Sequence, residues 1–578
     1  MFTSGRAMHV NFKQMRKTAV YKYVAGLLCF GAIVSGCEKD YLDVDPTDRV
    51  SDAAILTDSV LFEAYVVNRY LGAKVIGNEG DAYQPGFGRG FEYAMWSSIT
   101  DESIYNNDDN SWLVQQGQLS PENLGMAGAV WSRSYRSIRE VNYALTHIEE
   151  LEMSTERTER LRAELRFIRA FRYHDIIRNY GKAVLIGDRV SSLDDDLTDP
   201  FWFDRRPIAE CMAYVLGELE EIAPGLPLNN SGEYPEGRAT RGAALALKSR
   251  LALYAASPLY NDGAGDSQKW AAAAQAASEV MDLGIYSLYP DYQELFTAES
   301  SNGEYIFARF YNLNARHLAL EIANGPNGYG GWGGNIPLQN LVDDYEMEDG
   351  TAFSWDNPEH AEAPYENRDP RFYATILYNG ASYRGRSVET FVPGGRDSQE
   401  GNDNWNTSKS GYYLNKFIRE DLPIINPWDV AGVQNWIYFR YGEILLNYAE
   451  AQNEAVGPDE SVYSAVNAIR NRPGVEMPAL PEGLSQSEMR ERIRHERRIE
   501  LAFEEHRFYD VRRWMIADET ENEPAYGITI TKNTDGSLEY ERKTALEGKS
   551  FSEQHYWLPI PRTEILASDN QLEQNPFY

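Results

Sequence analysis

Cysteine is scarce in this sequence, with only three in 578 residues. A fold held together by several disulfides is therefore excluded, and stability must come from packing. The rest of the composition is that of a globular protein, with 43% hydrophobic, 25% charged and 12% aromatic residues. These fractions exclude a disordered or collagen-like chain, because they supply enough apolar surface for a sizeable core.

Positive charge is also in short supply. The 55 basic residues face 88 acidic residues, which gives a formal net charge of −33 at pH 7. Residues 1–36 carry five of the basic residues and no acid, so the remainder of the chain has a net charge of −38. Nucleic acids and anionic membrane surfaces are bound by basic patches. The sequence therefore predicts no nucleic-acid partner.

The apolar run near the N-terminus is too short to cross a bilayer. It covers residues 24–34, follows a short basic stretch and ends in Val34-Ser35-Gly36-Cys37. This is the pattern of an export signal, and its end resembles a bacterial lipobox, in which small residues precede a cysteine that becomes lipidated. We therefore predict a lipoprotein signal peptide over 1–36, a lipid on Cys37 and a lipidated tether over 37–50, which anchors the protein to a membrane.

No internal disulfide is expected in the mature chain. Cys29 lies inside the predicted signal and Cys37 carries the lipid, so Cys211 is left alone. Apolar residues surround Cys211 at helical spacing, which predicts a buried core thiol.

Amphipathic helical patterns fill two parts of the sequence. In the predicted helix 159–178, Phe167, Phe171 and His174 recur at helical spacing, and Gly181 follows as a C-cap. His174 is expected to be a core histidine. Further helices are predicted at residues 131–151, 207–222, 240–256, 268–283, 438–456, 461–471 and 487–514. Paired helices of this length indicate a tetratricopeptide-like array, although the 34-residue motif of such repeats is not cleanly matched.

Between these two parts the helical periodicity vanishes. Residues 302–428 are rich in Gly, Pro, Asn and aromatic residues, as in the run GPNGYGGWGG at 325–334. Loops of this length are usually functional. The predicted fold is therefore mainly α, a tetratricopeptide-like helical scaffold with a large irregular, loop-rich ligand-binding region. Its expected divisions are 51–300, 301–430 and 431–578, the last ending in an extended tail.

Catalytic motifs fail on their spacing. His495-Glu496 begins like a zinc-protease helix, but Ile499 occupies the position of the second histidine. Gly328-x-Gly330-x-x-Gly333 matches a dinucleotide fingerprint, yet no apolar strand precedes it. We predict no catalytic residue, no cofactor and no metal site. A glycosidase with paired carboxylates stays open, because such pairs meet only in space.

One acid interrupts an apolar helix face near the C-terminus. On the predicted helix 488–505, Glu496 lies among Met489, Ile493 and Ile499. An acid in such a position is usually paired, so we predict a buried structural ion pair for Glu496. The candidate partners are Arg492, Arg497 or an arginine of another helix.

Several helical segments carry a family resemblance. They are RGAALALKSRLALYAASPLYN at 241–261, FRYGEILLNYAEA at 439–451 and ERRIELAFEEHRFYDVRRW at 496–514, with YWLPIP at 556–561 and QNPFY at 574–578 in the tail. On these segments the chain resembles the SusD/RagB family of outer-membrane nutrient-binding lipoproteins, with Phe577 where a glycine is common. The resemblance covers nearly the whole mature chain, and Tyr41-Leu42-Asp43 after the lipobox agrees with it.

The resemblance implies a scaffold, a partner and a location. The scaffold would have four tetratricopeptide-like units and a variable region for ligand. The partner would be a SusC-like, TonB-dependent β-barrel transporter, on which the lipoprotein sits as a lid. The protein would be lipid-anchored in the outer membrane and face the cell exterior.

The expected ligand is a glycan. A sugar ring offers an apolar face and a rim of hydroxyls, so its site needs aromatic platforms beside amides, carboxylates or guanidinium groups. Two stretches offer both, residues 96–112 and the glycine-rich loop 325–334, and the family places ligand-stacking aromatics in matching stretches. The predicted ligand-binding residues are Trp96, Trp332, Tyr329, Asp101 and Arg89.

The predicted function is binding of an oligosaccharide or polysaccharide and its delivery to the transporter, without turnover. A peptide-binding uptake lipoprotein is the alternative within binding. A surface glycosidase is the alternative of another class.

Overall fold

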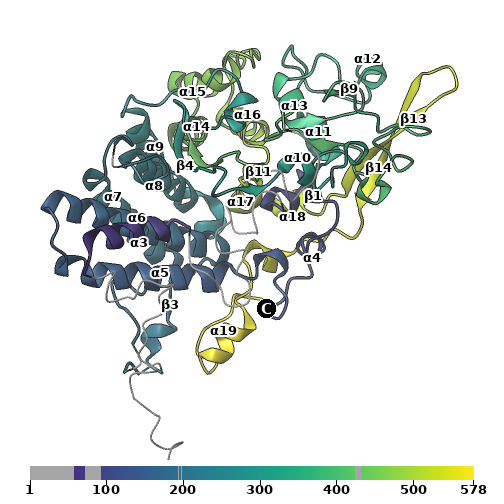
Figure 1. The fold of residues 1–578 in the computed structure, drawn as a ribbon. Coiled ribbons are helices and arrows are strands. Elements are labelled where there is room, and N and C mark those ends of the chain that lie inside the picture. Colours follow the sequence, from purple (N-terminus) through teal and green to yellow (C-terminus); the bar gives the residue numbers. More distant parts are fainter. Residues whose placement is uncertain (1–56, 72–92, 193, 197, 233, 423–430) are drawn as a thin grey trace, which may run out of the picture. The chain divides into compact units, whose positions relative to one another are not determined.

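The structure is a computed structural model that describes residues 57–71, 93–192, 194–196, 198–232, 234–422 and 431–578 (Figure 1). Its long helices are α3 (Ser59–Arg69), α5 (Val130–His147), α6 (Thr155–Tyr180), α7 (Ile208–Ile222), α8 (Arg241–Ala256), α9 (Ser267–Met281), α14 (Tyr441–Val456), α15 (Glu460–Arg470) and α16 (Gln486–Glu500). They follow the predicted segments closely, except for α3, which has no counterpart among the predicted helices, and α16, which ends earlier than predicted. The predicted signal peptide, the tether and Cys37 lie outside the described residues.

Side-chain caps define where these helices begin and end. Ser154 accepts a hydrogen bond from the backbone N–H of Arg157 at the start of α6, and Thr240 caps α8 in the same way. Ser485 and Glu488 form a reciprocal capping box at the start of α16. Gly181 ends α6 with a φ of 73°, as predicted, because a residue with a side chain is strained there.

Consecutive helices pack against one another. The packed pairs are α5 with α6, α6 with α7, α7 with α8, α8 with α9, α9 with α14, and α14 with both α15 and α16; α5 to α9 lie stacked in Figure 1. This confirms the mainly α fold with a tetratricopeptide-like scaffold. His174 and Cys211 are fully buried in it, as predicted, and burial lowers the pKa of His174 to about 3. The residues from Glu63 to Tyr578 form one compact unit.

The prediction of one long helix over 487–514 is wrong. The helix α16 ends at Glu500, and α17 (Arg507–Arg513) begins after a turn in which Phe503 and Glu505 have left-handed φ values of 61° and 63°. No residue of a right-handed helix adopts such values.

Side chains from other elements explain the break. The Tyr292 hydroxyl and the Arg440 guanidinium both donate to the carbonyl of Glu500, at 2.7 and 2.9 Å. The ammonium of Lys416 donates to the carbonyl of Ala502 at 2.7 Å. These carbonyls therefore have tertiary partners in place of the next helical turn, which helical periodicity alone could not reveal.

Strands are short and pair in twos. All the ladders among the described residues are antiparallel two-stranded sheets, most of them connecting segments far apart in sequence. The pairs are β1 (Ser103–Tyr105) with β6 (Asn335–Pro337), β2 (Ala183–Val184) with β3 (Arg205–Arg206), β4 (Tyr305–Arg309) with β12 (Trp436–Arg440), β5 (His317–Leu318) with β11 (Ala431–Gly432), β7 (Ile376–Leu377) with β10 (Tyr413–Leu414), β8 (Ser382–Tyr383) with β9 (Arg386–Ser387), and β13 (Ala525–Lys532) with β14 (Leu538–Leu546).

The C-terminal tail, predicted as extended, contains the long hairpin β13–β14 and helices. The remaining short helices of the described chain are α4 (Trp112–Gln115), α10 (Leu320–Ala323), α11 (Gln339–Asp344), α12 (Pro358–Glu362), α13 (Pro370–Thr375), α18 (Ala517–Thr520) and α19 (Arg562–Ala567). No helix in the described ranges combines the length and the apolar character needed to cross a membrane.

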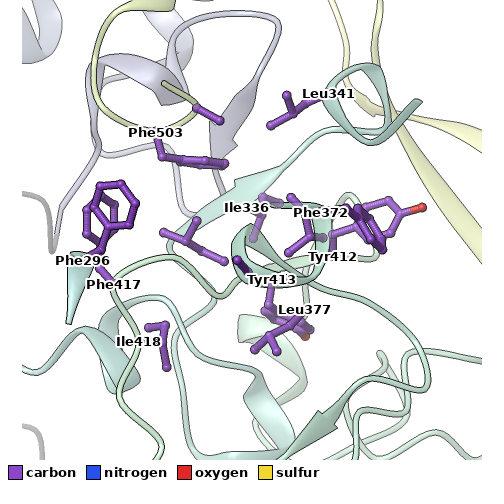
Figure 2. Close-up of a cluster of buried hydrophobic side chains, with 14 of the residues drawn as sticks. Phe296, Ile336, Leu341, Phe372, Leu377, Tyr412, Tyr413, Phe417, Ile418 and Phe503 are labelled. Carbon is purple, nitrogen blue, oxygen red and sulfur yellow. The ribbon is translucent and has the colours of Figure 1, made fainter. Parts of the chain in front are cut away.

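The loop-rich region shares a hydrophobic core with segments before and after it in the chain. Figure 2 shows Phe296, Phe417 and Ile418 beside Tyr413, Phe372 and Leu377, with Phe503 from the turn after α16. These residues come from distant segments, so burial of their apolar surface holds the irregular chain together. A second cluster, which includes Leu446, Val466 and Ile493, lies between α14, α15 and α16.

Buried ion pairs connect the loop-rich region with α16. Arg371 of α13 donates to Glu496 at 2.5 Å and to Glu500 at 3.0 Å. Arg470 of α15 binds the other oxygen of Glu496 at 2.9 Å. Burial alone would raise the pKa of Glu496, but these two arginines shift it below its ordinary value. The predicted ion pair of Glu496 is thus confirmed, with partners from other helices.

Candidate functional site

Trp96 is a core residue in the structure. It lies in the short 3-10 helix η3 (Trp96–Ser98) and has 0% of its surface exposed. Its ring centroid is 4.6 Å from that of Phe508 and 5.8 Å from that of Tyr509, both on α17. The prediction of Trp96 as a ligand platform is therefore corrected, because protein rings already pack against the indole.

Asp101 is occupied by two arginines. Its carboxylate accepts hydrogen bonds from Arg498 at 2.6 Å and from Arg507 at 2.8 Å, and it is buried. Burial would raise its pKa, but the two guanidinium groups hold the pKa well below the usual range. Asp101 fixes η3 and the following strand to α16 and α17, and its proposed role as a ligand-binding group is corrected accordingly. Arg89 lies outside the described residues.

Tyr329 and Trp332 lie within the glycine-rich loop 325–334. Tyr329, in η10 (Asn327–Tyr329), is half-buried; its hydroxyl donates to the carbonyl of Tyr383 at 2.8 Å, and the guanidinium of Arg386 lies 3.6 Å from its ring centroid. The ring of Tyr329 is thus already in contact with a cation of the protein itself, Arg386. Trp332 is half-buried, and its backbone N–H donates to the carbonyl of Ile322 at 2.7 Å.

The glycines of this loop are required by close backbone approaches. A Cβ on Gly331 would lie 2.1 Å from the carbonyl oxygen of Gly325, within the same loop. A Cβ on Gly328 would lie 2.4 Å from the carbonyl oxygen of Arg396. The loop therefore folds tightly on itself and against residues 394–411, which fixes the position of Trp332.

Asn106 joins the two predicted aromatic stretches to a third segment. Its backbone N–H donates to the carbonyl of Gly334 at 2.8 Å, continuing the pairing of β1 with β6. Its side-chain amide donates to the carbonyl of Thr407 at 3.1 Å and accepts from the backbone N–H of Lys409 at 3.1 Å. The structure thus brings residues 103–112, 325–337 and 394–411 together around one buried asparagine.

Trp405 is the aromatic residue that the sequence prediction missed. It lies in η11 (Asn404–Asn406), where the preceding Asp403 has a φ of 51°, and 71% of its surface is exposed. The sequence did contain an indication that Trp405 could bind a sugar, because the run Asn-Asp-Asn-Trp-Asn at 402–406 combines one indole with three amides. No single motif, however, distinguishes such a tryptophan from a buried one.

A polar cleft of about 410 Å³ lies beside Trp405. Segments 390–411, 528–530 and 543–545 line it, and they offer the hydroxyls of Thr407, Thr529 and Thr544. Together, Trp405 and the cleft present an exposed flat ring next to many hydrogen-bonding groups.

The cleft has little capacity for acid–base chemistry. Asp397 is the only acid among the described residues that line it. Its two carboxylate oxygens accept hydrogen bonds from Arg386 at 2.6 and 2.8 Å, and the backbone N–H of Glu389 adds a third at 2.8 Å. A glycosidase needs a pair of carboxyl groups with room for sugar and water between them, and the described lining does not supply one.

Trp112 completes the aromatic residues near this cleft. Its indole N–H donates to the carbonyl of Tyr105 at 2.8 Å, and the ammonium of Lys409 lies 5.2 Å from its ring centroid. Trp112 is half-buried and supports the Asn106 junction from the side of α4.

Comparison with known proteins shows which family has this architecture. A model of the SusD family matches residues 295–578, and a model described as "Starch-binding associating with outer membrane" matches residues 40–253. A SusD-like protein of Formosa agariphila is 25% identical over 489 residues, covering 78% of this chain and 81% of the relative.

Solved structures agree. A SusD-like protein of Bacteroides fragilis NCTC 9343 matches with a TM-score of 0.74 and 29% identity over 93% of this chain and all of that one. A SusD-like carbohydrate-binding protein of the same strain matches with a TM-score of 0.72 and 25% identity, over 89% and 99% of the two chains. The chain therefore belongs to the SusD family.

Proposed function

We propose that this protein binds a glycan at Trp405 and the polar cleft beside it, with Trp332 of the glycine-rich loop, which folds against residues 394–411, as a second aromatic platform. The carrying observation is the 71% exposure of the Trp405 indole at the edge of a cleft rich in hydroxyls. An exposed ring gains by covering the C–H face of a sugar, and amides and hydroxyls beside it bind the sugar's hydroxyl rim. The name of the carbohydrate-binding relative and the description of the starch-binding family model support this proposal.

The proposal includes an anchor and a partner. Cys37 carries the lipid that holds the protein on the outer membrane, facing the cell exterior, and the bound glycan passes to a SusC-like, TonB-dependent β-barrel. The protein itself turns nothing over. The engaged state of Asp397 supports the last point, because the only described acid of the cleft is already bound to an arginine.

Trp405→Ala and Trp332→Ala test the site. Each variant should lose about tenfold to a hundredfold in glycan affinity, since a stacked ring is worth about 1 to 3 kcal/mol. The measurement is calorimetric titration with a glycan that the native protein retards in a native gel. Trp202→Ala is the matched control, because Trp202 is half-buried in η6 (Pro200–Trp202) and belongs neither to the cleft lining nor to the glycine-rich loop.

The rival functions give different results in the same assay. Release of reducing ends from a retarded glycan would identify a glycosidase and contradict the proposal. Binding of peptides with no binding of any glycan would favour a peptide-uptake protein instead. Unchanged glycan affinity in both tryptophan variants would move the site away from this surface.

The anchor and the partner are tested separately. Cys37→Ala should leave a folded protein that is released from the membrane fraction by a high-salt wash when the transporter is absent. The native lipoprotein should co-purify with the barrel in mild detergent, through an interface of more than about 2,000 Å² as in permanent complexes. Recovery of the native protein only as a free monomer, with the barrel expressed, would contradict the partnership.

A further inference from the structure

Two lysines line the cleft beside Trp405. Lys409 belongs to the segment that carries Trp405, and Lys543 belongs to β14 of the C-terminal hairpin. The hairpin is fixed to that segment by backbone hydrogen bonds, among them the N–H of Ile528 to the carbonyl of Ser410 at 2.8 Å. Both lysines are half-buried, so their positions depend on the fold and not on free surface motion.

No described acid neutralises these lysines. Neither Lys409 nor Lys543 forms an ion pair with any residue that the structure describes, and the carboxylate of Asp397 is held by Arg386. The ammonium of Lys409 donates to the carbonyl of Asn106 at 2.5 Å, which leaves two of its three N–H donors for other partners. Burial lowers the pKa of both lysines, because their ammonium groups have lost part of their hydration.

A second polar cleft has a lining of the opposite charge. It has a volume of about 600 Å³ and is lined by residues 291–299 and 418–421. Five acids line it, and its single arginine, Arg419, pairs with Glu299 and Asp421. The Trp405 cleft differs from it, since the charged groups of its described lining that lack an ion pair are positive.

We propose that the glycan bound beside Trp405 is acidic, with carboxylate or sulfate groups that are bound by Lys409 and Lys543. This inference rests on the proposed function. Trp405 stacks on a sugar ring while the two ammonium groups bind anionic substituents of the same or the next sugar. A hydrogen bond between ionised partners is roughly twice as strong as one between neutral groups, so the charge of the glycan decides its affinity.

Two pairs of polymers with matched backbones test the inference. De-esterified homogalacturonan is compared with its fully methyl-esterified form, and native carrageenan with its chemically desulfated form. We expect the acidic member of at least one pair to bind about tenfold more tightly than its neutral partner, as a charge-assisted contact predicts. The pair that responds tells a carboxylate ligand from a sulfate ligand.

Lysine variants connect the preference to the cleft. Lys409→Gln and Lys543→Gln should each reduce affinity for the acidic polymer about fivefold to tenfold and weaken its salt dependence, while affinity for a neutral polymer is unchanged. Lys532→Gln is the matched control, since Lys532 is an exposed lysine of the same hairpin outside the cleft lining. Thermal melts of all variants show whether the loss of the Lys409 contact with Asn106 disturbs the fold, in which case Lys543→Gln carries the test.

The outcomes separate the two proposals. Neutral polymers that bind as tightly as acidic ones, with binding still lost in Trp405→Ala, would contradict the acidic ligand and leave the glycan site intact. Full acidic-polymer affinity in both lysine variants would also contradict the inference. Failure of the native protein to bind any of the four polymers would count against both proposals.

Discussion

The helical scaffold and the loop-rich region, residues 301–430, are held together by different interactions. In the scaffold, α8 and α9 pack through small apolar side chains, and helical hydrogen bonds satisfy nearly all the backbone. In the loop-rich region the ladders are two to five residues long, so many carbonyls need other donors. Buried side chains supply them, as where Arg368 donates to the carbonyls of Pro364 and Tyr345 at 2.8 and 2.7 Å.

The two regions should therefore be sensitive to substitutions of different kinds of residue. The scaffold depends on apolar volume that repeats with the helix, whereas the loop-rich region depends on individual polar residues whose partners are distant in sequence. Exposed side chains of the loop-rich region, such as the indole of Trp405, do not contribute to the packing of the fold and are available to contact a ligand. Five substitutions and one control variant test this contrast.

The pair Trp96→Ala and Trp405→Ala should show the largest difference. Trp96 is fully buried against Phe508 and Tyr509, so its truncation should cost about 3 to 5 kcal/mol of folding free energy. Trp405 is 71% exposed, and its truncation should change the folding free energy by less than about 0.5 kcal/mol. Urea unfolding of both variants measures this. Equal losses in the two would mean that Trp405 is part of the fold and would weaken its assignment to a ligand.

Arg371→Met tests the connection between the two regions. Arg371 is 1% exposed and pairs with Asp369, Glu496 and Glu500, so its removal takes a buried cation away from three buried carboxylates, of which Glu496 still keeps Arg470. Breaking such a buried pair costs about 3 to 5 kcal/mol. Arg396→Met is the control, because its pair with Glu389 is exposed and should contribute little. A loss in urea unfolding no larger than the control's would show that the ion pairs do not hold the loop-rich region on α16.

Sequence patterns predicted the scaffold well and the loop-rich region poorly, for a physical reason. Helical spacing and local caps such as Ser154 and Gly181 are encoded within a few residues, and the observed helices begin and end close to the predicted positions. The break after Glu500 depends on Tyr292 and Arg440, which are distant in sequence and invisible to periodicity.

The site shows the same limit at the level of single residues. Trp96 and Trp405 both have polar neighbours in sequence, yet one is buried and the other is exposed. Their difference lies in α17, which covers the first ring, and in the left-handed Asp403, which begins the turn that displays the second. The glycine-rich loop was recognisable, because only glycine permits its close approaches, but its contact with residues 394–411 was not.

Glu505→Gln should reveal a pH-dependent weakness where α16 breaks. Burial raises the pKa of Glu505 to about 7 from an ordinary value of 4.5, although Arg178 opposes the shift. Between these pH values the unfolded chain has lost the proton that the folded chain keeps, so the native protein loses stability as the pH rises. The loss is about 1.4 kcal/mol per pH unit.

The variant removes this ionisation. Glu505→Gln should therefore resemble the native protein near pH 4.5 and exceed its stability by about 3 kcal/mol above pH 7, measured by urea unfolding across that range. The glutamine oxygen can still accept the hydrogen bond from the backbone of Trp96. Parallel pH curves for the two proteins would show that Glu505 is ionised at the same pH folded and unfolded.

Asn106→Ala should cost less stability than Trp96→Ala or Arg371→Met and should have a selective effect on binding. Its buried side chain donates to the carbonyl of Thr407 and accepts from the N–H of Lys409, so alanine leaves both groups without these partners. An unsatisfied buried group costs about 1 to 3 kcal/mol, less than the loss of Trp96 or Arg371 because no large ring or charge is involved.

In Asn106→Ala, the segment that carries Trp405 should also lose its fixed position beside the cleft. We expect glycan affinity to fall while the scaffold keeps its protection in amide hydrogen exchange, with the lost protection confined to residues around 103–112 and 394–411. Loss of protection throughout α5 to α9 would mean that the loop junction and the scaffold unfold as one unit, and that the two regions are not separable in the way their interactions suggest.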